Sequence, residues 1–317
     1  MELKNIFRKS ALVLALGLPV FLTSCKKDED PSNTITDVVV NNGSFSILEA
    51  AVLKANLQTT LSGTGPFTVF APNDAAFTAS GITTTTLNSL TPAQVSNILL
   101  YHTIPARILA ADVPAGPNAK VVTASGDSVF VTKNSTGVFI NGIQVTSADV
   151  AADNGVIHVV GRVLNPPAGN IVETAVASGL DSLVKAVTRA TTAAGGDPTL
   201  AGTLGSAKLT VFAPTNAAFT QLLSALSLTD INQIPINTLL AVLRYHVVGT
   251  RAFSSDLANG NLTMLAGGNA TINLTNGAGG GPTILGNGNS GNRSNITATN
   301  IVCRNGVVHL IDRVLLP

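Results

Sequence analysis

Apolar residues recur along this chain in two patterns, one with the period of a helix and one with the alternation of a strand. Thr91 predicts a helix start, since proline follows it at once and Gln94 lies three residues later. The Thr91 and Gln94 side chains can accept hydrogen bonds from backbone N–H groups that have no partner within the first turn. Asn170 and Glu173 have the same spacing ahead of another apolar-periodic stretch. Both segments are therefore predicted to be capped helices.

Short β-rich runs follow the helical segments. The runs 129–132, 137–140 and 143–145 are rich in Val, Phe and Ile, which favour strands. Asn141 and Gly142 separate the last two runs, and both residue types accept the positive φ of a tight hairpin turn. With helices first and a strand meander later, the pattern predicts an α+β domain.

The chain contains this unit twice. The second copy is longer, and the additional residues lie around 191–207 and 276–292. Their Gly, Thr, Ala and Asn content predicts surface loops. The repeated segments are 46–50 and 182–186, 67–77 and 209–219, 101–102 and 245–246, 154–160 and 305–311, and 162–164 and 313–315.

The first residues predict an export signal. Basic residues precede an uninterrupted apolar run over 11–22. About twelve helical residues span roughly 18 Å, less than the ~30 Å of a membrane core, so residues 1–24 are predicted to be a signal peptide. The following Leu-Thr-Ser-Cys at 22–25 resembles the lipobox of bacterial lipoproteins, which implies lipid attachment at Cys25. An ordinary signal peptide with an incidental cysteine is the alternative.

A dense charge cluster follows this cysteine, made of Lys26, Lys27, Asp28, Glu29 and Asp30. It is interpreted first as a solvated tether. It also resembles the acidic export signal of Bacteroidota lipoproteins. That resemblance implies an outer-membrane lipoprotein exposed at the cell surface.

Composition limits the function classes. Hydrophobic residues make up 45% of the 317 residues, which excludes a disordered chain. Lys+Arg number 18 and Asp+Glu 17, so no overall charge attracts nucleic acid. Two cysteines cannot form a disulfide scaffold, and Cys303 lies in an apolar stretch that predicts a buried strand position. With no Trp, the chain is poor in stacking faces for sugars.

The repeated blocks resemble the fasciclin domain family. The resemblance implies two tandem α+β domains, each a β-wedge or sandwich with small flanking helices. The predicted parts are a signal peptide at 1–24, a lipidated tether at 25–34, one domain at 35–166 and a second at 167–317. The residues that match the family motif, interpreted as structural, are Phe70, Pro72, Phe77, His158, Phe212, Pro214, Phe219 and His309.

The repeated Tyr-His pairs are the candidate partner-binding residues. In animal fasciclin domains this motif is linked with cell adhesion, although packing at a helix–strand junction explains it at least as well and is favoured here. The pairs are Tyr101 with His102 and Tyr245 with His246. His158 and His309 each alternate with valines on a strand, which favours hydrogen-bonded core histidines over a metal site.

No nucleophile, phosphate-binding or metalloprotease motif occurs in the chain. The sequence therefore predicts a non-enzymatic surface lipoprotein that needs no cofactor or metal. Its partner would be an extracellular protein, a polysaccharide or another cell, with membrane contact only through the lipid and no nucleic acid. The alternative is an accessory subunit of an outer-membrane nutrient-uptake or glycan-binding complex.

Overall fold

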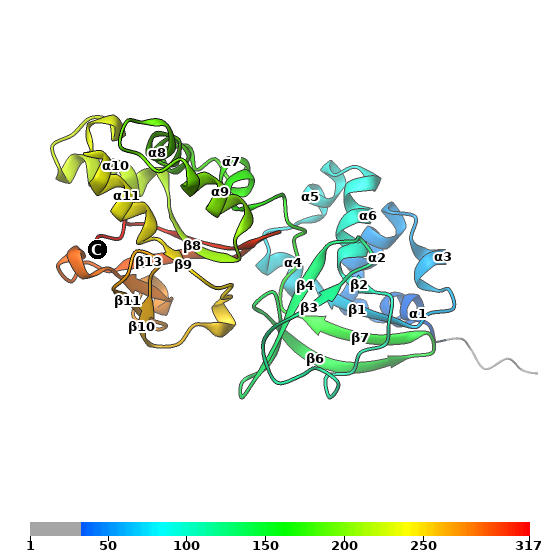
Figure 1. The fold of residues 1–317 in the computed structure, drawn as a ribbon. Coiled ribbons are helices and arrows are strands. Elements are labelled where there is room, and N and C mark those ends of the chain that lie inside the picture. The colour runs from blue at the N-terminus through cyan, green and yellow to red at the C-terminus, as the bar shows by residue number, and fades with distance from the viewer. Residues whose placement is uncertain (1–32) are drawn as a thin grey trace, which may run out of the picture. The chain divides into compact units, whose positions relative to one another are not determined.

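The computed structural model describes residues 33–317, which form one compact unit made of two copies of one α+β domain (Figure 1). Each copy places its helices mainly before a run of strands, as the sequence pattern predicts. The first domain comprises α1 (Ile35–Val40), η1 (Gly43–Phe45), α2 (Ser46–Lys54), α3 (Gln58–Leu61), β1 (Phe67–Pro72), α4 (Asp74–Ala79), α5 (Thr84–Ser89), α6 (Pro92–Tyr101), β2 (Thr103–Ile104), β3 (Gly116–Val122), β4 (Ser128–Asn134), β5 (Gly137–Ile140), β6 (Ile143–Ala152) and β7 (Gly155–Val160).

The second domain repeats this order with additional short helical turns. It comprises α7 (Ile171–Ala177), α8 (Asp181–Thr192), α9 (Thr199–Ser206), β8 (Leu209–Pro214), α10 (Asn216–Ala225), η2 (Ile231–Gln233), α11 (Ile236–Arg244), β9 (Val247–Val248), η3 (Ser254–Asp256), β10 (Gly260–Thr263), β11 (Asn269–Asn273), η4 (Ala278–Gly280), β12 (Thr283–Leu285), η5 (Asn287–Asn289), β13 (Ser294–Cys303) and β14 (Gly306–Ile311).

Both domains have the same sheet topology. The strand order is β2-β1-β7-β6-β5-β4-β3 in the first seven-stranded sheet and β10-β11-β12-β13-β14-β8-β9 in the second. Neighbouring strands are antiparallel except for one parallel pair in each domain, β1 with β7 and β8 with β14. The first and last strands of each domain are therefore adjacent inside its sheet, second and third from one edge. Strand β8 is buried along its whole length, because the sheet carries a core on each face.

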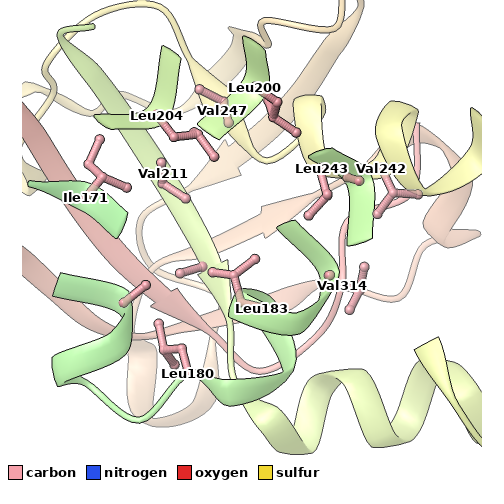
Figure 2. Close-up of a cluster of buried hydrophobic side chains, with 14 of the residues drawn as sticks. Ile171, Leu180, Leu183, Leu200, Leu204, Val211, Val242, Leu243, Val247 and Val314 are labelled. Carbon is pink, nitrogen blue, oxygen red and sulfur yellow. The ribbon is translucent and has the colours of Figure 1, made fainter. Parts of the chain in front are cut away.

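One core of each domain lies between the sheet and the helices, and the other lies inside the curved sheet. In the second domain Leu183, Leu204, Leu243 and Val211 belong to the helix-side core, which Figure 2 shows in close-up. Phe212, the neighbour of Val211 on β8, belongs to the other core, because successive side chains of a strand point to opposite faces. The same division separates Phe77 from Phe70 in the first domain, so the family-motif phenylalanines are all core residues.

The local signals in the sequence are confirmed. Thr91 and Gln94 form a reciprocal capping box at the start of α6, and Asn170 with Glu173 does the same at α7. The turn between β5 and β6 has Asn141 at a φ of 51°. Both hairpin residues therefore adopt the positive φ that the Asn-Gly pair predicts.

The two predicted surface loops are wrong in part. Within 191–207 the chain forms helix α9, whose Leu200 and Leu204 are only 3% and 7% exposed. Within 276–292 it forms strand β12, whose Ile284 is fully buried. In both cases a few apolar side chains bury against the rest of the domain, and each stabilises the fold by roughly 1.5–3 kcal/mol. Tertiary burial thus outweighs a composition that favours loops.

An asparagine just before the last strand ties each domain together. Asn154 accepts a hydrogen bond from the backbone N–H of Ile35 and donates to the carbonyl oxygens of Leu61 and Gly63, at 2.7–2.9 Å. It therefore joins the start of α1, the segment before β1 and the turn before β7. Its counterpart Asn305 makes the same three bonds, each at 2.9 Å, to the N–H of residue 171 and the carbonyls of residues 204 and 207.

We predict that Asn154→Ala and Asn305→Ala each lower the free energy of unfolding by roughly 2–4 kcal/mol, because each leaves one backbone N–H and two carbonyl groups without their partner. Urea denaturation followed by circular dichroism measures this loss. Asn41→Ala, at an exposed helix end, is the matched control and is expected to change stability by less than about 0.5 kcal/mol. Equal stability of all three variants would contradict the structural role of these amides.

Candidate functional site

The Tyr-His pair of the first domain lies at the end of α6, and both side chains are buried. Tyr101 is 0% exposed; its hydroxyl donates to the carbonyl of Ser128 at 3.1 Å and accepts from the side-chain amide of Asn141 at 3.0 Å. Burial raises the pKa of this phenol well above its ordinary value. Tyr101 therefore joins the helix to β4 and to the β5–β6 hairpin.

His102 joins α6 to the end of the domain. Its Nδ1 lies 2.7 Å from the carbonyl oxygen of Ile98, and its Nε2 accepts from the backbone N–H of Leu164 at 2.9 Å. This pattern requires the neutral ring with its proton on Nδ1. Burial lowers the pKa of His102 to about 4, against an ordinary value of 6.5.

The second domain repeats both arrangements. The hydroxyl of Tyr245 donates to the carbonyl of Asn269 and accepts from the N–H of Asn287. His246 lies 2.7 Å from the carbonyl of Val242 through Nδ1 and accepts from the N–H of Leu315 through Nε2. Burial lowers the pKa of His246 to about 4 as well. The exposure of these two side chains is 1% and 2%, which favours the packing interpretation over direct contact with a partner.

His158 and His309 lie on the last strands, β7 and β14, and are 5% and 0% exposed. In each, Nδ1 accepts from a backbone N–H of the neighbouring strand, that of Asp149 at 3.2 Å or of Asn300 at 3.4 Å. The Nε2 atoms lie 2.9 and 3.0 Å from the carbonyl oxygens of residues 108 and 252. Each ring also stacks on the motif phenylalanine of the adjacent parallel strand, with centroids 5.9 and 5.4 Å apart. Burial lowers the pKa of His309 to about 4.

Sequence reasoning missed the residues that complete this arrangement. Asp149 and Asn300 have φ values of 60° and 64° and lie at irregularities in strands β6 and β13. Thr68 and Thr210 each donate through their hydroxyl to one backbone carbonyl and accept from one N–H of the segment that the histidine also holds. The threonine recurs within the repeated F-T-V-F and L-T-V-F segments, so the repeat itself carried this signal.

The remaining candidate residues divide between cores and the N-terminal segment. Pro72 and Pro214 end the buried strands β1 and β8, and Phe219 packs in the helix-side core. Cys303 is a free thiol, fully buried at the end of β13 as predicted, and burial raises its pKa. Cys25 and the charge cluster Lys26 to Asp30 lie outside the described residues.

Neither a metal-binding cluster nor a membrane-spanning helix occurs in the described part of the chain. Across residues 33–317, no three His, Cys, Asp or Glu side chains gather as a metal site requires. Within the same range, no helix is long and apolar enough to cross a membrane. The full sequence contains four histidines, and both ring nitrogens of each contact backbone groups. As placed here, these rings fix the backbone rather than offer a nitrogen to a ligand.

We predict that both domains lose stability in mild acid. His246 and His309 have folded-state pKa values of about 4 in the second domain, and His102 has such a value in the first. Because these values lie below the unfolded value of 6.5, the unfolded chain binds more protons as the pH falls. Stability present above pH 6.5 is therefore lost towards pH 4, by about 3 kcal/mol for each histidine.

Hydrogen exchange resolved by domain at pH 7, 6 and 5 measures this loss. His309→Gln, which cannot take up a proton, is the control. It is expected to lower stability at pH 7 and to flatten the pH dependence of the second domain. An unchanged slope in the variant would contradict the assignment.

Comparison with known proteins agrees with the repeated architecture. The Fasciclin domain model matches residues 43–166 and 182–317. Protein sll1483 of Synechocystis is 41% identical over 140 residues, which are 44% of this chain and 76% of that protein. Transforming growth factor-beta-induced protein ig-h3 of Sus scrofa is 33% identical over 138 residues, which are 44% of this chain and only 20% of that protein.

A solved structure of a domain pair from the insect cell adhesion molecule fasciclin I is similar over 87% of this chain and 98% of its own. The identity there is 19% and the TM-score 0.40. The family model, by contrast, covers both repeats and most of the chain. The protein therefore belongs to the fasciclin domain family.

Proposed function

We propose that this protein is a non-enzymatic surface lipoprotein whose two fasciclin domains attach the cell to an extracellular protein, a polysaccharide or another cell. The observation that carries the proposal is the use of all four histidines as backbone ties in two intact fasciclin domains. The residues best suited to acid–base or metal chemistry at neutral pH are thereby committed to the fold.

The partner contact belongs to exposed side chains and not to the Tyr-His pairs. Tyr101 and Tyr245 are fully buried or nearly so, and each hydroxyl has both a donor and an acceptor partner. A partner could reach them only by opening the junction between helix and sheet, which would expose apolar core. Changes in these residues therefore act on binding through stability.

We predict that Tyr101→Phe and Tyr245→Phe leave adhesion unchanged below the unfolding temperature while lowering that temperature by several degrees. Each change keeps the ring in the core but removes the hydroxyl and leaves its hydrogen-bond partners unpaired. Binding of cells that carry each variant to arrayed matrix proteins and polysaccharides provides the measurement. Loss of adhesion with the fold intact by circular dichroism would assign a direct role to the tyrosine hydroxyls.

Anchoring is proposed to depend on Cys25. The short apolar run at 11–22 followed by Leu-Thr-Ser-Cys supports lipid attachment at this thiol. We predict that Cys25→Ser either releases the protein from membranes or leaves its signal uncleaved, as measured by fractionation and mass spectrometry. With the domains unchanged, these cells are also expected to lose adhesion. A Cys25→Ser protein that is still lipidated would refute the anchor.

The charge cluster is proposed to direct export to the cell surface. Changing Asp28, Glu29 and Asp30 to Ala is expected to leave lipidation intact and to reduce protease accessibility on whole cells. Unchanged accessibility would reduce the cluster to a tether. Stoichiometric recovery of a transporter with the solubilised protein would instead favour the accessory-subunit function.

A further inference from the structure

The curved sheet of the first domain encloses an apolar cavity of about 240 Å³. Strands β1, β3, β4, β5 and β6 and the segment after β2 contribute side chains to it. Its lining includes Phe70, Ile104, Val113, Val131, Ile140 and Val145. The cavity extends to the surface beside Asp112 and Pro114, which also line it and are exposed.

The polar groups of the wall are already paired. The Thr68 hydroxyl donates to the carbonyl of Ala106 at 2.7 Å and accepts from the N–H of Ile108 at 2.9 Å. His158 has both ring nitrogens at backbone partners. These groups therefore leave neither donor nor acceptor free for an occupant. Such a wall favours a hydrocarbon over a polar molecule or a cluster of waters.

The rim of the cavity is held in place by side chains outside it. The ammonium group of Lys133 donates to the carbonyls of Ala110 and Val113 at 2.9 and 3.3 Å, and Asp149 accepts from the N–H of Ala110 at 2.9 Å. The carboxylate of Asp112 accepts from the N–H of Leu109 at 3.0 Å. The opening is thus preformed, and its rim carries both a lysine and carboxylates, so the apolar wall decides which occupant fits.

The second domain provides an internal comparison, because its strands share the pairing of the first. Strand β4 pairs Val131 with Ile140, and β11 pairs Ile272 with Ile284, so Ile272 stands where the first domain has valine. By the same comparison Ile296 stands in place of Val145, since each faces the sixth residue of the last strand. Both isoleucines are buried, at 2% and 7% exposure.

A third position follows from matching turns. The carboxylate of Asp256 accepts from the N–H three residues before it, as Asp112 does, so Leu257 takes the place of Val113. At two lining positions the first domain has the larger side chain: Ile104 corresponds to Val248, and Ile108 to Ala252. The cavity of the first domain is present even with these two larger side chains. At three positions that line the cavity of the first domain, the second domain thus has a side chain that is larger by one carbon. The fold therefore tolerates the larger side chain at these positions.

We propose that this cavity binds one small, neutral molecule made mostly of hydrocarbon, such as an aromatic ring or a short alkyl chain. A cavity of ~150 Å³ lined by aliphatic and aromatic side chains suffices to bind benzene, and the space here is larger. It is smaller than the ~300 Å³ at which sites for drug-sized ligands begin. This site is independent of the proposed adhesion.

Toluene is the probe, titrated into the purified chain with methyl-labelled Val, Leu and Ile observed by NMR. Saturable binding of one molecule is expected, with the largest shifts at Val113, Val131 and Val145. The triple variant Val113→Leu/Val131→Ile/Val145→Ile is expected to weaken toluene binding at least tenfold without lowering the unfolding temperature. Val150→Ile, on β6 but packed in the helix-side core, is the control and is expected to bind toluene like the wild type.

Three results would overturn the proposal. The first is the absence of saturable toluene binding to the wild type, and the second is shifts centred on methyl groups away from the cavity. The third is unweakened binding by the folded triple variant. If the triple variant fails to fold, Val131→Ile alone replaces it, with a threefold or greater loss of affinity expected and an unchanged affinity counting against the site.

Discussion

Each domain depends on the parallel pairing of its first strand with its last. For β1 and β7 to approach closely enough, the residue at the start of the last strand must lack a side chain, because a Cβ at Gly155 would lie 2.1 Å from the carbonyl oxygen of Phe67. A Cβ at Gly306 would lie 2.2 Å from the carbonyl of Leu209. The Asn-Gly pair thus has two roles. The asparagine hydrogen-bonds to the neighbouring segments, and the glycine allows the first strand to approach the last. Because both strands of this pair are buried, both faces of the sheet must be covered there, by helices on one side and by the curvature of the sheet on the other.

The histidines follow from the same constraint. A ring on the last strand lies within reach of the neighbouring strand and of the segment after β2 or β9, and His158 and His309 contact backbone in both. His102 and His246 likewise join two segments. Each connects the end of helix α6 or α11 to the segment after the last strand, through the N–H of Leu164 or Leu315. An imidazole can donate at one edge and accept at the other, so it joins two backbone segments that no aliphatic side chain could satisfy. Its matched occurrence in both repeats is thereby explained without any ligand.

Local signals in the sequence were sufficient for the elements that depend on a few adjacent residues. The caps at Thr91 and Asn170 and the Asn141 turn act within three or four residues of themselves, and the structure has each of them. Helix α9 could not be predicted from composition, because Leu200 and Leu204 stabilise it only through the core they enter. The positive φ of Asp149 is likewise set by its bond to a histidine on another strand. The cavity is harder still to predict from the sequence, because it depends on the sizes of side chains on several strands that only the fold brings together.

The two domains therefore share a frame and differ in what fills it. Bonds that fix the frame, from Asn154, Thr68 and His158, have counterparts in the second domain with distances that agree to within a few tenths of an ångström. The hydrophobic side chains inside each sheet are less constrained, because the same backbone can hold side chains of different volume if the total packing remains favourable. A duplicated domain can thus keep its frame while the side chains that line the interior of each sheet differ in size. Differences between the two copies of this chain are consequently a better guide to ligand binding than the motifs they share, which are used by the fold itself.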